Sequence, residues 1–359
     1  MGHQSDTLDE SLTRASLAYR ELRLDEAEAA YQAVADLDPD NYQAYLGLAR
    51  TYTRMRLPDK ARAAAERCIE IDRGRHEGYA ALGVLLFLID ENQEASEMLQ
   101  EAIRIAPEDP EAHITLAQVW ADMADNERSQ NELNIAYRAI EWIENEEERR
   151  AMFALYWHGA TYQRIAQGKN HEAREAAQEA IALQDANPYA ACLAYSNLGI
   201  LEARERNYDR AIEYLGQAYE MNPFFYRAGS ALGRLYIMRN QPARAVEVLG
   251  DVLEKTPADE QTGTRYAYAL ALNRAGQREE AREQYGLALE GGLRGFDKLM
   301  ARWQTLWLTP TIRNIIVLAA VAAVVAWLVL VQPSANTITF VGLMALIVIL
   351  QRVFGRRRG

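Results

Sequence analysis

Apolar and small residues return along this chain with a fixed long period. Within each stretch they are three or four residues apart, which is the spacing of one face of an α-helix. Alanine marks the period most clearly, because 34 residues separate Ala27 from Ala61, Ala61 from Ala95, and Ala211 from Ala245. A constant interval of this size predicts a stack of similar supersecondary units. Strand signals are nearly absent before residue 310, so we expect an all-α fold.

Other positions of the period indicate how one unit folds. A proline follows the alanine by twelve residues at four places: Pro39, Pro107, Pro223 and Pro257. Proline cannot continue the helical hydrogen-bond ladder, so it ends the second helix of a unit. Small residues permit two helices to cross closely, and aromatic residues fill the spaces between units. Each unit is therefore predicted to be a helical hairpin that buries its apolar face only against its neighbours.

This pattern of small, aromatic, alanine and proline positions resembles the tetratricopeptide repeat family, whose repeat is 34 residues long. The resemblance covers residues 8–292 and implies a right-handed solenoid of about eight helix-turn-helix units, preceded by a short tail at residues 1–7. In the fourth unit Ser129 replaces the expected alanine, and the second helix is predicted to run on through residues 144–150. The resemblance favours binding over catalysis.

Two long apolar stretches follow the repeats. Residues 315–331 are all apolar, and residues 338–350 are interrupted only by Thr339 and Gly342. A membrane-spanning helix needs about 20 apolar residues, with a range of about 17–25. Residues 311–359 are therefore predicted to form a transmembrane hairpin. The alternative is a buried hairpin in a soluble protein, but a solenoid has no interior large enough to cover both stretches.

The positions of the arginines predict the orientation of this hairpin. Arginines precede the first stretch and follow the second, whereas the connecting loop carries no charge. Because positive residues stay on the cytoplasmic side, we expect both termini in the cytoplasm. The expected location is the inner membrane of a prokaryote. The N-terminus is polar, so no signal peptide is expected. Residues 293–310 are predicted to be an amphipathic juxtamembrane helix; the alternative is a helix that caps the last repeat. The predicted membrane-interface residues are Trp303, Trp307, Arg313, Arg352, Arg356, Arg357 and Arg358.

Charge and composition restrict the class of partner. The formal net charge is −12, and without the five arginines of the tail 34 basic residues face 51 acidic ones. An anionic bilayer surface repels such a body, so we expect the solenoid to project away from the membrane and to bind no nucleic acid. Cys68 and Cys192 lie at apolar helical positions and are expected to be core residues without a disulfide.

The sequence contains no motif that points to catalysis. It lacks a phosphate-binding loop, a glycine-rich dinucleotide turn and a nucleophile elbow. Its five histidines do not pair with one another or with cysteine at metal-ligand spacing. We therefore expect neither an enzyme nor a cofactor or metal site.

Partner binding is expected in the concave groove, which in this family is lined by the first helix of each unit. In the late units no acid falls at the groove positions, and arginine offers bidentate donors to carboxylates. The hypothesis is a docking groove for an acidic peptide segment; the alternative is that these arginines pair with Glu202, Glu205 or Asp209. The predicted groove residues are Arg164, Asn197, Arg204, Arg227, Arg234, Tyr266, Asn273 and Arg274.

The early units give a less uniform groove. Their groove positions carry Arg50 and Arg54 together with the acids Glu77, Glu111 and Asp122. A second candidate surface is an apolar floor in the third unit, for which core packing is the alternative; it comprises Val84, Phe87 and Leu88. Chaperone-binding members of the family hold a terminal carboxylate with lysine and asparagine. Only Asn197 matches that clamp, so the activity is not expected.

The sequence therefore predicts a membrane-anchored scaffold or adaptor that binds proteins, in assembly of a membrane complex or as its accessory subunit. The alternative is a membrane effector whose hairpins oligomerise into a pore, since alanines give the first span a small face for helix contact. Neither span carries a charged residue in its core, which favours an anchor over a channel. The sequence leaves the number of copies in an assembly open.

Overall fold

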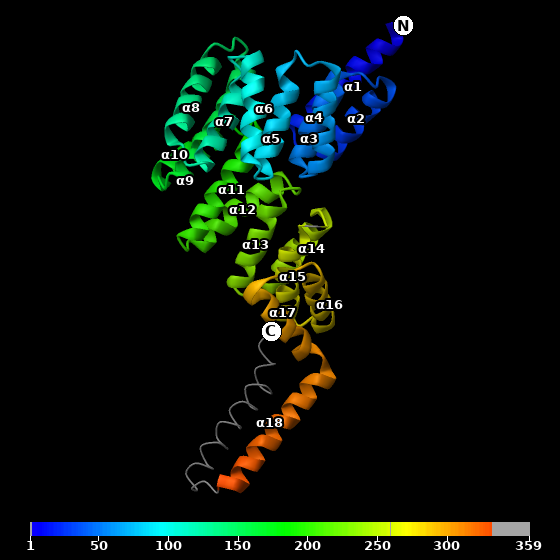
Figure 1. The fold of residues 1–359 in the computed structure, drawn as a ribbon, viewed down its shortest axis with the longest axis vertical. Coiled ribbons are helices and arrows are strands. Elements are labelled where there is room, and N and C mark those ends of the chain that lie inside the picture. The colour runs from blue at the N-terminus through cyan, green and yellow to red at the C-terminus, as the bar shows by residue number, and fades with distance from the viewer. Residues whose placement is uncertain (1, 259, 332–359) are drawn as a thin grey trace.

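The computed structural model describes residues 2–258 and 260–331, and these residues form eighteen α-helices joined by short turns, with no strand among them (Figure 1). The first sixteen helices pair into eight consecutive hairpins, which confirms the repeat solenoid. The hairpins are α1 (Gly2–Arg20) with α2 (Leu24–Leu37), α3 (Tyr42–Arg54) with α4 (Pro58–Ile71), α5 (His76–Leu88) with α6 (Asn92–Ile105), α7 (Pro110–Asp122) with α8 (Asn126–Glu141), α9 (Glu146–Ala166) with α10 (Asn170–Ala182), α11 (Pro188–Arg204) with α12 (Tyr208–Met221), α13 (Tyr226–Met238) with α14 (Pro242–Lys255), and α15 (Gln261–Ala275) with α16 (Arg278–Glu290). Helices α17 (Gly295–Leu308) and α18 (Pro310–Val331) follow.

The turn inside every hairpin has the same backbone form. After the first helix one residue adopts a left-handed conformation, and the next amide donates to a carbonyl five residues back, as Leu57 N does to Tyr52 O and Glu91 N to Leu86 O at 2.9 Å each. This arrangement satisfies carbonyls that the helix end leaves free. The left-handed residues are Leu22, Arg56, Asp90, Ala124, Gly168, Arg206, Asn240 and Gly276.

Close helix crossing within a hairpin depends on glycine. A Cβ atom at Gly83 would lie 2.6 Å from Leu99 Cγ, and one at Gly233 would lie 2.4 Å from Leu249 Cγ. The leucine of the second helix thus fills the space that a side chain on the first would need. Leu99 and Leu249 are fully buried, so these contacts form the repeating core.

The fourth and fifth units differ from the predicted boundary. Helix α8 ends at Glu141 and α9 begins at Glu146, so residues 144–150 do not extend the second helix of unit four. Asn145 accepts a hydrogen bond from Glu148 N and thereby caps α9. Ser129, at the alanine position, is buried and donates to Ala117 O at 2.7 Å, which satisfies its hydroxyl within the core.

The first superhelical turn closes on itself. In Figure 1 the stack runs from α1 to α10 and then turns, so that α11–α13 pass beneath α3. Asn222, at the end of α12, donates to Arg54 O at 3.3 Å although 168 residues separate them, and Arg56 lies over the ring of Phe225. Arg20 of α1 also pairs with Glu147 of α9 at 3.1 Å. The last repeats continue below this closed turn.

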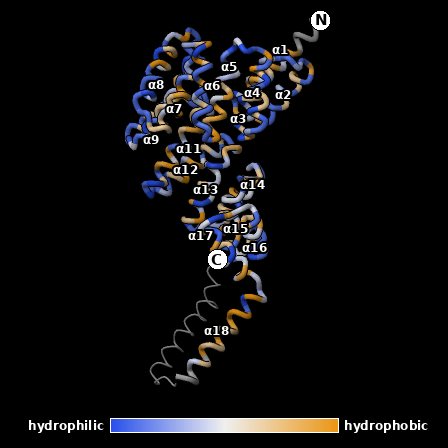
Figure 2. The backbone as a smooth tube through the Cα atoms, in the orientation of Figure 1, coloured by the Kyte–Doolittle hydropathy of each residue, from blue (hydrophilic) through white to orange (hydrophobic). Residues whose placement is uncertain are grey.

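Helix α18 leaves the solenoid at an angle of 89° to α17 and extends away from it (Figure 1). Figure 2 shows that its residues are mostly apolar, and most side chains from Pro310 to Val324 are exposed, Leu318 by 68% and Val321 by 56%. Among the described residues no single helix meets the length and hydropathy of a membrane span, whereas α17 and α18 up to Val324 meet them together as a bent pair. The predicted second stretch at residues 338–350 and the arginines Arg352, Arg356, Arg357 and Arg358 lie outside the described residues.

Candidate functional site

The closed superhelical turn surrounds a cavity of about 840 Å³. Its wall is formed almost entirely by the first helices of the units, α1, α3, α5, α7, α9, α11 and α13. These helices face the superhelix axis because the second helix of each hairpin packs outside them. The cavity is therefore the concave groove of the first seven units, closed by the contacts between α3 and the α11–α13 segment.

Arg54 is central to that closure. Its guanidinium group lies between two tyrosine rings, 3.6 Å from the centroid of Tyr19 and 4.3 Å from that of Tyr189. Its Nη1 donates to Tyr19 O at 2.9 Å, and its own carbonyl accepts from Asn222. These two cation–π contacts join α1, α3 and α11 through one side chain. Burial raises the pKa of Tyr19, with Arg54 acting in the opposite direction, so its ring stays neutral.

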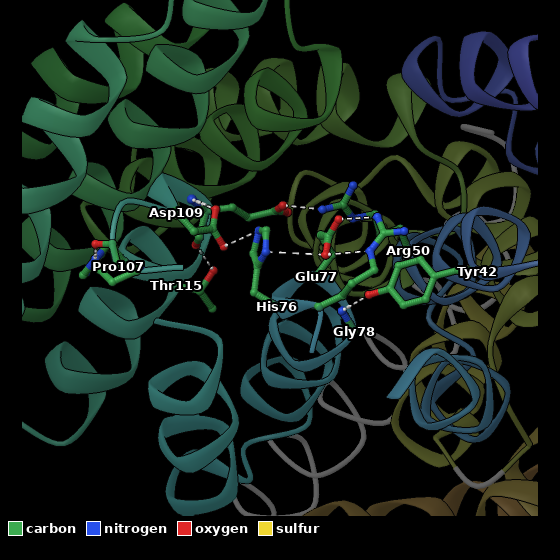
Figure 3. A network of polar contacts seen from close by, with 11 residues as sticks. Tyr42, Arg50, His76, Glu77, Gly78, Pro107, Asp109 and Thr115 are labelled. Atoms are coloured by element: carbon green, nitrogen blue, oxygen red, sulfur yellow. Dashed lines mark hydrogen bonds and ion pairs between the residues drawn. The ribbon is translucent and has the colours of Figure 1, made fainter. Parts of the chain in front are cut away.

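Next to this stack lies a polar network across α3, α5 and α7 (Figure 3). Arg50 pairs with Glu111 at 2.7 Å, and this carboxylate raises the pKa of Arg50. His76 lies 3.8 Å from an Asp109 carboxylate oxygen, and burial followed by Glu111 raises the pKa of Asp109. Burial opposes ionisation of Glu77, but the hydrogen bond from Arg75 lowers its pKa below the usual value. The positive charge of Arg50 is therefore balanced within the protein.

Other cationic side chains of the wall have no carboxylate partner among the described residues. Among the described residues Arg54, Arg56 and Arg227 form no ion pair with a carboxylate, although all three line the cavity. Asp90 is the acid of the wall without a described ion pair, since Glu111 is held by Arg50. The wall is thus locally electropositive in a protein whose net charge is −12.

Buried polar side chains also reach the wall. His158 of α9 is 7% exposed, and its Nε2 lies 3.2 Å from Gln118 Nε2. Burial lowers the pKa of His158 to about 4, so its ring is neutral. Within the described residues three buried nitrogens of the wall have no hydrogen-bond partner: Arg54 Nε, His158 Nδ1 and Asn197 Nδ2.

The predicted groove residues do not form one continuous row. Asn197 and Arg227 line the cavity, whereas Arg234 of the same groove donates to Gly263 O at 3.3 Å farther along the solenoid. Arg204 is exposed at the end of α11, and Arg164 donates to Glu172 O at 3.1 Å. The late units therefore hold a second group of predicted residues, separate from the cavity.

This second group is partly engaged by neighbouring helices. Arg274 donates to Ile237 O at 2.6 Å, Asn273 donates to Gln304 at 3.2 Å, and the ring of Tyr266 lies 5.9 Å from that of Tyr285. The acids proposed as alternative partners are paired elsewhere. Glu202 and Glu205 bind Arg174, and Asp209 binds Arg239. The predicted arginines are thus not neutralised by those three carboxylates.

The predicted apolar floor lies in the wall of the cavity. Val84, Phe87 and Leu88 all line it, and Phe87 also packs edge-to-face on Tyr162 at 5.5 Å between ring centroids. Phe87 is buried in the core and also borders the cavity, so core packing and a place in the groove floor are compatible. Sequence reasoning missed Tyr19, Tyr189 and Arg56, since superhelical closure brings them together and no local pattern signals it.

The described membrane-interface candidates are in α17 and at the start of α18. Trp303 and Trp307 stack with ring centroids 5.9 Å apart, and Trp303 is 47% exposed. Phe296 and Leu299 of α17 are exposed as well, whereas Ala301 and Leu308 pack against the last repeat. One helix thus covers the end of the solenoid and presents an apolar outer surface. Arg313 is half-buried near the start of α18.

Comparisons with known proteins agree with this architecture. Sequence profiles of the tetratricopeptide repeat match residues 18–85 and 202–264, 164–224, and 76–109. The chain therefore contains tetratricopeptide repeats. It is similar to Hsp70-Hsp90 organizing protein 3 of Arabidopsis thaliana, with 29% identity over 93 residues, which is 26% of this chain and 17% of that relative.

Solved structures show the same fold at low identity. The APC/C hetero-tetramer Cut9-Hcn1 matches with a TM-score of 0.57 and 15% identity over 83% of this chain and 55% of the other. The human IFIT1 dimer with PPP-AAAA matches with a TM-score of 0.54 and 16% identity over 80% of this chain and 70% of the other. At these identities the likeness concerns the helical solenoid alone.

Proposed function

We propose that this tetratricopeptide-repeat protein is a membrane-anchored, non-enzymatic scaffold whose solenoid binds a protein partner through an acidic segment. Repeats of this type suggest a protein-interaction scaffold, and the partial relative in Arabidopsis thaliana is named as an organiser of two chaperones. Assembly of a membrane complex, or membership in one as an accessory subunit, is the setting that fits an anchored scaffold. Anchoring raises the local concentration of whatever the solenoid binds.

The observation that carries the partner's chemistry is the uncompensated arginine on the concave side of α13. Arg227 and Arg234 are exposed, lie two helical turns apart on one helix, and form no ion pair within the described part of the chain. Exposed guanidinium groups at this spacing suit carboxylates of an extended segment. An acidic protein that keeps these cations unpaired selects acidic partners by charge.

Charge reversal tests the partner site. The double variant Arg227→Glu/Arg234→Glu is expected to lower partner capture at least tenfold, because two attractive contacts become repulsive. The measurement is co-purification from the native host with quantification of the bound protein. Arg210→Glu is the matched control, since Arg210 is an exposed arginine of α12; its capture should equal that of the unmodified protein. Undiminished capture by the double variant would exclude this surface.

Support for the anchor comes from α18, whose apolar side chains are exposed over several turns. Such a surface is costly in water and favourable in a bilayer. We propose that α18 and the apolar stretch at residues 338–350 hold the protein at the inner membrane, with both termini in the cytoplasm. The stacked Trp303 and Trp307 of α17 would lie at the headgroup level, where tryptophan is enriched.

Purification in mild detergent from the native host, beside a form that ends before Thr311, separates the roles of solenoid and anchor. A stoichiometric partner retained by both forms is the expected result, because recognition is placed in the solenoid. A partner lost on truncation would instead place recognition in the C-terminal segment and refute this assignment.

A further inference from the structure

The cavity within the first superhelical turn has two kinds of wall. One part is apolar and includes Leu46, Val84, Phe87, Leu155 and Leu193. The other part carries the cations that have no carboxylate partner. A volume of about 840 Å³ lies in the range of sites that enclose small organic ligands. The wall thus suits a molecule with an apolar body and an anionic end.

The cationic part is organised around Arg54. Two tyrosine rings lie 3.6 and 4.3 Å from its guanidinium carbon, so further polar contacts of the group must come from its N–H donors. Nη1 uses one edge for Tyr19 O, and Nε on the other side of the group has no partner. A carboxylate matches a guanidinium edge with two parallel hydrogen bonds. The ring stack holds the guanidinium plane in place before any ligand arrives.

The unpartnered wall atoms also specify the ligand's hydrogen bonding. Gln118 Nε2 donates to His158 Nε2, so the proton of this neutral ring is on Nδ1. His158 Nδ1, Asn197 Nδ2 and Arg54 Nε are therefore all donors without an acceptor. An extended peptide brings one N–H donor with nearly every residue and needs acceptors in return. A wall with unsatisfied donors favours a ligand that brings acceptors and no donors.

We propose that this cavity binds an amphipathic acid, a single aliphatic chain that ends in a carboxylate. The carboxylate lies against the free edge of Arg54, and the chain extends along Val84, Phe87 and Leu193. The occupant links α3, α5 and α11 and thereby strengthens the closed form of the turn. This inference differs from the partner site on α13 in its class of ligand and in its main contact, Arg54; the two sites share only Arg227, which lines the cavity.

The test is calorimetric titration of the full chain in nanodiscs, with protein-free nanodiscs subtracted. The probes are sodium decanoate, decanol and decyltrimethylammonium, which share the chain and differ in the charge of the head. Decanoate is expected to saturate one site per chain, and the other two probes are expected to bind at least tenfold more weakly. Equal binding of all three, or no saturable decanoate site, would refute the proposal.

Variants locate the site. Arg54→Gln should weaken decanoate binding at least tenfold, whereas Arg73→Gln, at an exposed arginine in the turn before α5, should leave it unchanged. Because Arg54 also holds the turn closed, Val84→Trp serves as a second variant that fills the cavity and retains the Arg54 stack. Decanoate binding by a folded Val84→Trp protein at the unmodified affinity would place the site elsewhere. Full competition by an uncharged, capped leucine tetrapeptide would assign the cavity to peptides instead.

Discussion

At the scale of single residues, most hairpin turns require a left-handed backbone conformation at a residue whose Cβ atom disfavours it. Six of the eight turns have a residue other than glycine in the left-handed region, with φ between 55° and 66°. A Cβ atom costs roughly 1–2 kcal/mol in that conformation. The closing hydrogen bonds impose the shape regardless of the residue. These six positions are sites where stability was not maximised.

Ala124 and Gly168 occupy the same turn position in adjacent units and allow a reciprocal test. Ala124→Gly is expected to raise the free energy of unfolding by about 0.5–1 kcal/mol, because removing the Cβ relieves more strain than glycine adds in chain entropy. Gly168→Ala should lower it by about 1 kcal/mol, since its φ is 72°. Urea unfolding followed by circular dichroism measures both. Changes of the same sign in the two variants would contradict this explanation.

His158 gives a residue-scale prediction for pH. Its pKa falls from 6.5 in the unfolded chain to about 4 in the fold because burial disfavours the charged ring. Between these values the unfolded state binds more protons, so stability is complete above pH 6.5 and declines as pH falls toward 4, by roughly 3 kcal/mol. His113 acts oppositely: burial opposes its protonation, but Glu132 raises its pKa.

The difference between the unmodified protein and His158→Gln isolates this contribution. The variant should lose less stability between pH 6.5 and pH 4, as measured by urea midpoints at a series of pH values. His171→Gln is the control, because that side chain is 87% exposed, and it should reproduce the unmodified pH profile. Identical profiles for all three proteins would show that His158 does not titrate in this window.

At the scale of elements, α17 and α18 have one solenoid-facing surface and one apolar exposed surface. Ala301 and Leu308 pack on the last repeat, while the exposed leucines and valines of α18 have no described neighbour of their own kind. The helix that caps the array and the helix that we propose as the membrane anchor are thus successive parts of one segment. The bend of 89° between them is compatible with a helix in the interface followed by one that enters the bilayer.

Charged substitutions on α18 test the anchor. Leu318→Arg/Val321→Arg should move a large part of the protein out of the carbonate-resistant membrane fraction, because each central arginine costs about 3 kcal/mol in a bilayer. Leu37→Arg is the matched control, since Leu37 is 63% exposed on α2. Its fractionation should not change. Retention of the double variant at the unmodified level would argue against insertion of α18.

At the scale of the whole molecule, closure of the first superhelical turn converts the concave groove into a cavity. Among the contacts that hold α1 and α3 against the later units, two differ clearly in burial. Phe225 is 9% exposed beneath Arg56, whereas the ion pair of Arg20 with Glu147 is 58% and 75% exposed. A buried aromatic side chain stabilises a fold by several kilocalories per mole, whereas an exposed ion pair contributes at most about 1 kcal/mol to stability.

Phe225→Ala is therefore expected to loosen the closed turn and to lower the free energy of unfolding by roughly 3 kcal/mol. Arg20→Gln should change neither the closure of the turn nor the free energy of unfolding. Spin labels at Arg14→Cys and Glu213→Cys, both exposed positions, report the distance between α1 and α12. The distance distribution should broaden only in Phe225→Ala. Cys68 and Cys192 do not interfere, because burial raises the pKa of each thiol to about 12. Equal broadening in both variants would contradict this ranking of the contacts.

The sequence by itself determined the repeat and its helices, because helical periodicity, glycine at the crossings and proline at the unit ends are local signals. It placed Arg50, Arg54, Phe87, Asn197 and Arg227 on the concave side for the same reason. Only the tertiary structure decided that the first turn closes and that Arg54 lies between Tyr19 and Tyr189. Small rotations between successive hairpins accumulate from the second unit to the sixth, and the sum of these rotations, not any single motif, brings α3 to α11.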